Sequence, residues 1–136
     1  MTSAREIGMD DASFWPLIGP FCASVAVRRE LRVAPHVDDG DRWFVVTDDG
    51  ELLSAGVLRM RGTTAMLAHA WTEPGHRRRG LHDAVTSARM DAAIAAGASA
   101  IKVVASPAAV GNYTRLGFTV RSYRGRFAVM VREIQR

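Results

Sequence analysis

The sequence has very little cysteine, since Cys22 is the single one among 136 residues. One cysteine excludes an internal disulfide and a cysteine-rich metal site, so no metal is expected. Its ordinary role is that of a small buried apolar residue. No apolar run approaches the roughly 20 residues that a membrane-spanning helix requires, and the first residues lack the basic and apolar regions of a secretory signal. We therefore expect a cytoplasmic protein that makes no membrane contact.

Aromatic residues are also scarce, at 7% of the chain, whereas the hydrophobic share of 48% and the charged share of 24% are ordinary for a globular protein. This composition excludes a disordered chain. No internal repeat, low-complexity tract or linker interrupts the sequence. A length of 136 residues is enough for one hydrophobic core and too short for two. We expect residues 1–136 to form a single domain.

The formal net charge is +4, and the charges are distributed unevenly. Acidic residues are frequent in residues 1–50, whereas arginine dominates from Arg77 onward. A basic half of this kind suits either a nucleic acid or a phosphate-rich cofactor. The last arginines of the chain are Arg121, Arg124, Arg126, Arg132 and Arg136. Few aromatic residues accompany them for base stacking, so a nucleic acid is the less favoured partner.

Hydrophobic periodicity and turn signals predict a mixed α/β domain with a central sheet. The expected helices cover residues 12–18, 21–33, 81–95 and 106–116, and the expected strands cover 43–47, 52–61, 64–72, 100–104, 118–123 and 127–131. An apolar stripe runs along the third helix. His82, Thr86 and Arg89 are expected to lie away from that stripe. Ser106 is expected to cap the fourth helix.

A junction rich in glycine and arginine, TEPGHRRRGLH, joins a strand to a helix at residues 72–82. Free backbone N–H groups at a helix start, together with the helix dipole, form a ready anion site. Gly80 lets a phosphate approach the backbone closely, and Arg77, Arg78 and Arg79 add cationic contacts. The junction predicts a phosphate or pyrophosphate site, and the alternative is a basic loop on a solvated surface. It is neither a P-loop nor a dinucleotide-binding fingerprint.

Tyr113 lies on the expected helix that follows the next strand. A phenol at the edge of a helix stripe packs in the core with its hydroxyl at the boundary. A phenol also protonates a leaving thiolate in acyl transfer, as a general acid. Spacing alone leaves both roles open.

Two segments together resemble the GNAT superfamily of N-acetyltransferases. Residues 72–82 align without a gap with its motif V-x-P-x-x-R-G-x-G-x-G/A, which lies between a strand and a helix. Residues 105–118, ASPAAVGNYTRLGF, match its next motif, A-x-P-x-A-x-x-F-Y-x-x-L-G-F. One helix and one strand separate the motifs, as in the family, and the resemblance covers about residues 43–131. The family's first strand would be very short here, around residues 5–8.

The resemblance implies a mostly antiparallel, splayed central sheet flanked by helices, with a site for acetyl-CoA. Amides of residues 77–82 would hold the pyrophosphate, and the backbone of residues 70–72 would pair with the pantetheine and the acetyl carbonyl like an added strand. Tyr113 matches the position that commonly acts as general acid toward the departing thiolate. The implied cofactor-binding residues are Ala70, Trp71, Thr72, Arg77, Arg78, Arg79, Gly80, Leu81, His82, Ser106 and Tyr113.

Three features depart from the family's pattern. His82 replaces the usual small residue at the end of the glycine turn, and Ser106 aligns with a frequent CoA-binding asparagine. The strand before the turn lacks the Glu or His that some members use as a base. His69 is nearby, but strand alternation places it on the face opposite Ala68 and Ala70, so we interpret it as structural or surface-exposed. An amine that is already deprotonated, or a water relay, needs no dedicated base.

We therefore predict an acetyl-CoA-dependent N-acetyltransferase that moves an acetyl group to a primary amine by direct transfer in a ternary complex. Cys22 lies outside both motifs, which disfavours an acyl-cysteine intermediate. Two alternatives stay open: a non-catalytic, CoA-binding or regulatory module of the same fold, and an enzyme of this type that modifies a nucleic acid. The acceptor is expected to be a small-molecule or peptide amine that no motif identifies. Pairing into a homodimer is left open.

Overall fold

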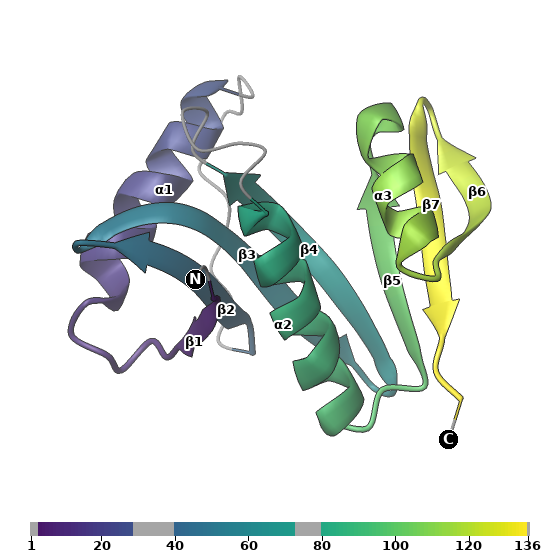
Figure 1. Cartoon of the computed structure of the whole chain (residues 1–136), viewed down its shortest axis with the longest axis horizontal. Coiled ribbons are helices and arrows are strands. Elements are labelled where there is room, and N and C mark those ends of the chain that lie inside the picture. The colour runs from purple at the N-terminus through teal and green to yellow at the C-terminus, as the bar shows by residue number, and fades with distance from the viewer. Residues whose placement is uncertain (1–2, 29–39, 73–79, 136) are drawn as a thin grey trace.

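A computed structural model describes residues 3–28, 40–72 and 80–135, which form one mixed α/β domain (Figure 1). The helices are α1 (Phe14–Arg28), α2 (Leu81–Ala95), a 3-10 helix (Pro107–Ala109) and α3 (Val110–Arg115). The strands are β1 (Arg5–Ile7), β2 (Arg42–Asp48), β3 (Glu51–Arg61), β4 (Thr64–Thr72), β5 (Ala100–Ala105), β6 (Thr119–Arg124) and β7 (Phe127–Glu133). None of the helices in these ranges is long and apolar enough to cross a membrane.

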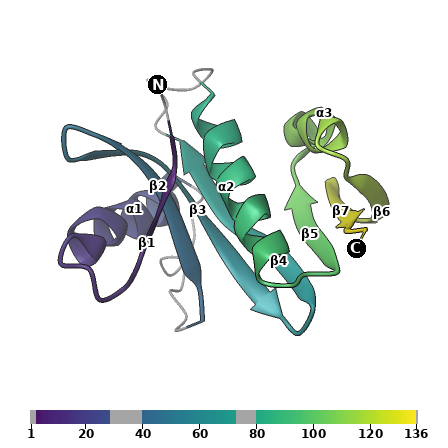
Figure 2. The same cartoon turned by 60° about the horizontal axis from the view of Figure 1, so that its bottom comes forward.

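The strands form one seven-stranded sheet in the order β1-β2-β3-β4-β5-β7-β6. Every neighbouring pair is antiparallel except β4 and β5, which run parallel. Helix α2 connects these two strands as a crossover, as parallel neighbours require. Helices α1 and α2 cover opposite faces of the sheet (Figure 2). The predicted fold class, a mixed α/β domain with a mostly antiparallel, splayed sheet, is confirmed.

Each face of the sheet has its own buried cluster. On the α2 and α3 face, residues such as Val85 and Ile101 are fully buried. On the α1 face, Trp43 packs edge-on against Phe14 and Phe21, with ring centroids 6.1 and 5.7 Å apart. Cys22 is buried in this second cluster, and burial raises the pKa of its thiol. Its predicted role as a small core residue is confirmed.

A single helix, α1, replaces the two helices predicted at residues 12–18 and 21–33. Pro16 lies in its first turn, where backbone N–H groups have no helical partner, so the missing proton removes no bond there. Pro20 lies inside the helix without ending it. Residues 29–33 of the prediction fall outside the described part of the chain. Ser106 is the N-cap residue of the 3-10 helix that precedes α3, as predicted, but its side chain makes no capping hydrogen bond.

Candidate active site

The sheet opens between β4 and β5. Their parallel ladder pairs residues 64–67 with residues 100–103 and extends no further among the described residues. Figure 1 shows the two strands diverging from that point. A cavity of about 510 Å³ lies in the opening. The residues that line it are Leu67, His69, Ala70, Val103, Val104, Ala105, Ser106, Ala109, Tyr113 and Phe127.

A β-bulge in β4 lies beside the point where the ladder ends. On β3, Gly56 pairs with Ala70 and Val57 pairs with Ala68, so His69 is the extra residue. His69 has a φ of 39°, a left-handed conformation that is uncommon for a residue with a side chain. A bulge bends its strand and increases the local twist. The bulge therefore accounts for the departure of β4 from β5 and for the position of the cavity.

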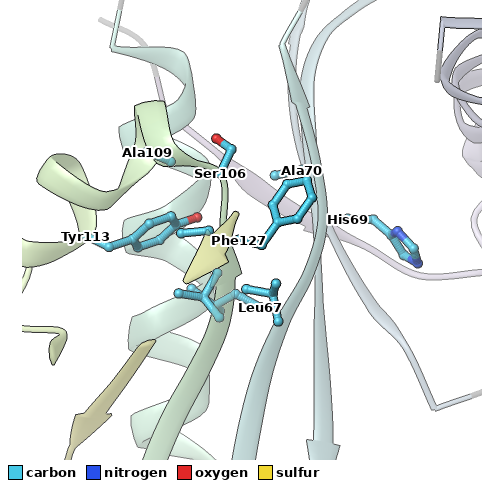
Figure 3. Close-up of a pocket in the computed structure, with 10 residues that line it drawn as sticks. Leu67, His69, Ala70, Ser106, Ala109, Tyr113 and Phe127 are labelled. Atoms are coloured by element: carbon cyan, nitrogen blue, oxygen red, sulfur yellow. The ribbon is translucent and has the colours of Figure 1, made fainter. Parts of the chain in front are cut away.

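The imidazole of His69 points away from the cavity, on the far side of β4 from Tyr113 (Figure 3). Strand alternation was the reason for predicting this orientation, but alternation does not hold at a bulge, where two residues oppose one. The bulge geometry itself sets the direction of the ring. His69 is therefore one of the residues that line the cavity, but its ring does not point into it.

Tyr113 forms the opposite wall of the cavity. Its residue is 4% exposed, and its ring packs edge-on against Phe118 and His82, with centroids 5.4 and 6.1 Å away. The hydroxyl points toward the opening between the strands (Figure 3). The predicted core position of the ring is therefore confirmed, and the hydroxyl lies at the cavity, while its role as a general acid stays a prediction.

The prediction that Thr86 and Arg89 lie away from the apolar stripe of α2 is wrong, because both are fully buried. Nη2 of Arg89 donates to Oγ1 of Thr86 at 3.3 Å, and Oγ1 lies 3.5 Å from Nδ1 of the half-buried His82. The spacing alone indicates the buried position of Arg89, because it follows Leu81 and Val85 at intervals of four residues and so lies on the same face of α2. Its charge made an exposed position the expected one.

The same arginine also contacts the bulge. Nη1 of Arg89 donates to the backbone carbonyls of Val57 and Ala68, at 3.1 and 3.3 Å. These carbonyls flank the step in register between β3 and β4. The side chain therefore links α2 to the bent part of the sheet. No pattern in the sequence indicates this contact.

Burial shifts the pKa of both ionisable groups on this face of α2. It lowers the pKa of His82, and the nearby charge of Arg89 lowers it further, while Asp83 acts in the opposite direction. Burial also lowers the pKa of Arg89. The electrostatic interaction and the polar contact with the Tyr113 side chain act in the opposite direction and raise that pKa. His82 is therefore favoured as the neutral imidazole, and Tyr113 is the group that most favours the arginine cation.

The N-terminus of α2 has the open geometry that the predicted phosphate site needs. Gly80 precedes the helix with a φ of 76°, and a Cβ placed on it would meet no atom of the described residues within 4 Å. Leu81 is buried in the core, so only its backbone is available to a ligand. The predicted contributors Arg77, Arg78 and Arg79 lie outside the described residues.

The end of β4 is held from the β3 side. Oγ of Ser54 donates to the carbonyl of Trp71 at 2.9 Å and lies 2.9 Å from Oγ1 of Thr72. The Trp71 ring packs against Phe21 on the α1 face, with centroids 5.4 Å apart. Residues 70–72 thus have a fixed partner on one edge, while their other edge lies beyond the ladder with β5.

Comparisons with known proteins agree with this architecture. A family model described as an acetyltransferase (GNAT) domain matches residues 19–129. The chain therefore belongs to the GNAT acetyltransferase family. A comparison with curated protein sequences gives no match.

Three solved structures illustrate the similarity of fold. The Escherichia coli ribosomal-protein-S18-alanine N-acetyltransferase has a TM-score of 0.76 at 17% identity, covering 100% of this chain and 96% of its own. An acyl-CoA N-acyltransferase from Pseudomonas aeruginosa has a TM-score of 0.78 at 16% identity, with 97% and 99% covered. N-acetylglutamate synthase from Neisseria gonorrhoeae, complexed with coenzyme A and N-acetyl-glutamate, has a TM-score of 0.74 at 15% identity, with 98% and 35% covered.

Proposed function

We propose that this protein is an acetyl-CoA-dependent N-acetyltransferase that moves an acetyl group to a primary amine by direct transfer in a ternary complex. The observation that carries the proposal is the position of Tyr113, whose hydroxyl points into the cavity where β4 leaves β5. A non-catalytic module of the same fold would not require a proton donor there. The orientation of the phenol therefore favours an enzyme.

The described residues fit an acyl-CoA thioester. The edge of residues 70–72 that lies beyond the ladder with β5 would pair with the pantetheine amides as an added strand does. The N–H groups at the start of α2 would donate hydrogen bonds to the pyrophosphate, with Gly80 leaving room for its approach. Arg77, Arg78 and Arg79 would add cationic contacts. Ser106, at the rim of the cavity, offers a hydroxyl to the same ligand.

The proposed chemistry needs one proton donor from the chain. As the acceptor nitrogen bonds to the acetyl carbon and the carbon–sulfur bond breaks, Tyr113 gives its hydroxyl proton to the departing sulfur. No carboxylate lines the cavity among the described residues. The amine would therefore arrive neutral or lose its proton to water.

The acceptor is proposed only as a class. The Escherichia coli relative is named for an alanine of a ribosomal protein, and the Neisseria gonorrhoeae relative holds an acetylated amino acid. At 17% and 15% identity these proteins share the fold and do not assign an acceptor. A small-molecule or peptide amine is the class consistent with both.

Binding of the donor is the first test. Acetyl-CoA or CoA at a hundredfold excess over its dissociation constant should stabilise the protein by about 2.7 kcal/mol, read as a rise in Tm, whereas NAD and ATP should do much less. Turnover is then measured as release of free CoA thiol with a panel of amines. No thermal shift at millimolar CoA would contradict the proposal, as would tight CoA binding without turnover of any amine.

Gly80→Val gives the binding test a matched control. Gly62 has a φ of 61° and equally open surroundings, but it lies in the turn at the other end of β4. Valine at either position carries the same kind of left-handed strain, of order 1–3 kcal/mol. Both variants should lose similar stability, and only Gly80→Val should lose CoA affinity, by about tenfold or more. Equal CoA affinity in the two variants would place the phosphate site elsewhere.

A further inference from the structure

Arg89 is a fully buried cation without a carboxylate partner among the described residues. Its terminal nitrogens donate to the carbonyls of Val57 and Ala68 and to the hydroxyl of Thr86. Its Nε is buried and has no hydrogen-bond partner in the described part of the chain. Arginine is almost never fully buried unless it is paired, because removing its charge from water is costly. Packing alone does not account for a charged group at this position.

The sheet is built to admit this side chain. Gly56 lies in the interior of β3, where glycine weakens a strand and often marks a close approach. A Cβ on Gly56 would lie 2.8 Å from Cζ of Arg89, closer than real carbon contacts allow. The missing side chain at Gly56 is therefore what gives the guanidinium its space against the bulge.

A chain of contacts through Thr86 and His82 also links the guanidinium to Tyr113 on the other wall of the cavity. The Tyr113 phenol is the group that favours the charged form of Arg89, against the effect of burial. The His82 ring packs on Tyr113 and is linked to Arg89 through Thr86. On the α2 side, the phenol therefore has a buried cation and a histidine that is favoured as neutral as its neighbours.

We propose that Arg89 is a positioning residue for acyl transfer, which holds the β4 bulge in place and presents its positive charge to the Tyr113 phenol. This inference rests on the proposed function. When Tyr113 gives its proton to the departing sulfur, the phenol becomes a phenolate in a buried site. A cation already fixed beside it stabilises that charge without reorganisation. The acceptor loses one proton to water, and the phenolate regains one from water, so the cycle is balanced.

A double-mutant cycle on the full chain separates this role from simple support of the fold. Arg89→Met keeps a long side chain and removes the charge. It should lower kcat by about tenfold or more in the parent, but by less than about threefold in a Tyr113→Phe background, because the charge then has no phenolate to stabilise. CoA affinity, read by thermal shift, should stay within about threefold. Equal losses of kcat in both backgrounds would overturn the proposal.

Arg115→Met is the matched control. Arg115 is exposed on α3, the helix that carries Tyr113, so the same substitution there removes a solvated charge. Its kcat should match that of the parent within about twofold. A loss as large as that of Arg89→Met would show that net charge, and not the buried cation, sets the rate.

Arg89→Lys keeps the proposal testable if Arg89→Met fails to fold. Lysine retains a cation but loses the fork that reaches both carbonyls and Thr86. It should lower Tm and retain more than about a tenth of the parental kcat. A folded Arg89→Lys protein as slow as Tyr113→Phe would overturn the role of the charge.

If the parent acetylates an amine and Tyr113→Phe slows it, the proposed function stands whatever the Arg89 variants do. A parent with no turnover would remove both proposals.

Discussion

The two walls of the cavity differ in how their functional features arise. On the α3 wall, the feature is one side chain, Tyr113, which would supply the proton in the proposed reaction and lies in a short sequence motif. On the β4 wall, the feature is the shape of the backbone, produced by a bulge at His69 and supported by Gly56 and Arg89. One wall can lose its function without losing its structure. The other cannot be changed without disturbing the packing beneath it.

The largest effect should come from removing the chemistry of the α3 wall. Tyr113→Phe keeps the ring and its contacts with Phe118 and His82 but removes the proton. Steady-state turnover with acetyl-CoA should fall by about 10²–10⁴-fold, as expected for loss of a general acid, while Tm and CoA affinity change little. An aryl thioester donor, whose thiolate leaves without a proton, should show a smaller loss. Equal rates for the parent and the variant would remove Tyr113 from the mechanism.

The contrast between the walls also explains what could be predicted from the sequence. The order of elements predicted the mixed α/β domain with a central sheet, because helix and strand periods and turn residues are local signals. The resemblance to the GNAT family supplied the mostly antiparallel, splayed sheet and the position of Tyr113 in the second motif. The junction at residues 72–82 gave the position of Gly80 at the start of α2. These features depend on residues that are close together in the chain.

The β4 wall could not be predicted in the same way. The bulge depends on pairing between β3 and β4, and the burial of Arg89 depends on a glycine 33 positions earlier in the chain, at Gly56. Single-sequence periodicity assigns a charged residue to the solvent side, and nothing local to α2 indicates the space that a distant strand provides. The merging of the two predicted N-terminal helices into α1 has a different origin, since Pro20, at the boundary between them, lies inside α1 without ending it. Proline in a first helical turn removes no bond, so Pro16 was no stop signal.

The next largest effect should come from disturbing the shape of the β4 wall. Gly56→Ala would place a Cβ 2.8 Å from both Cζ of Arg89 and Cγ1 of Val85. Overpacking of this kind costs about 1–3 kcal/mol, measurable as a lower midpoint of urea unfolding. The displaced guanidinium should also lower kcat, although Gly56 lies outside the lining of the cavity.

Gly19→Ala is the control for that variant. Gly19 lies in α1, and a Cβ added there would meet no atom within 4 Å in the part of the chain that the structure describes. The same chemical change should leave stability unchanged or raise it by up to about 1 kcal/mol, because glycine is a poor helix former. The double variant Gly56→Ala, Arg89→Met should lose less stability than the sum of the two single variants. Methionine is smaller than arginine and leaves part of the space that the new Cβ needs. Strict additivity would show that the glycine does not serve the arginine.

The smallest effect should come from His82, which lies where the two walls meet. Its ring packs on Tyr113 from α2, and burial, aided by the charge of Arg89, lowers its pKa from 6.5. The unfolded chain therefore binds the proton more tightly than the folded one. The stability that this provides is fully present above pH 6.5 and is lost as the pH falls through the lower pKa of the folded state.

His82→Ala should remove this acid sensitivity. Between pH 7.5 and 5.5, above the titration of most carboxylates, the parent should lose more Tm than the variant, with a difference of no more than about 4 °C. Turnover at pH 7.5 should change by less than about threefold, because the proposed proton comes from the phenol and the family places a small residue at this position. A loss of turnover as large as that of Tyr113→Phe would place the proton source on α2 and reverse the assignment of chemistry to the α3 wall.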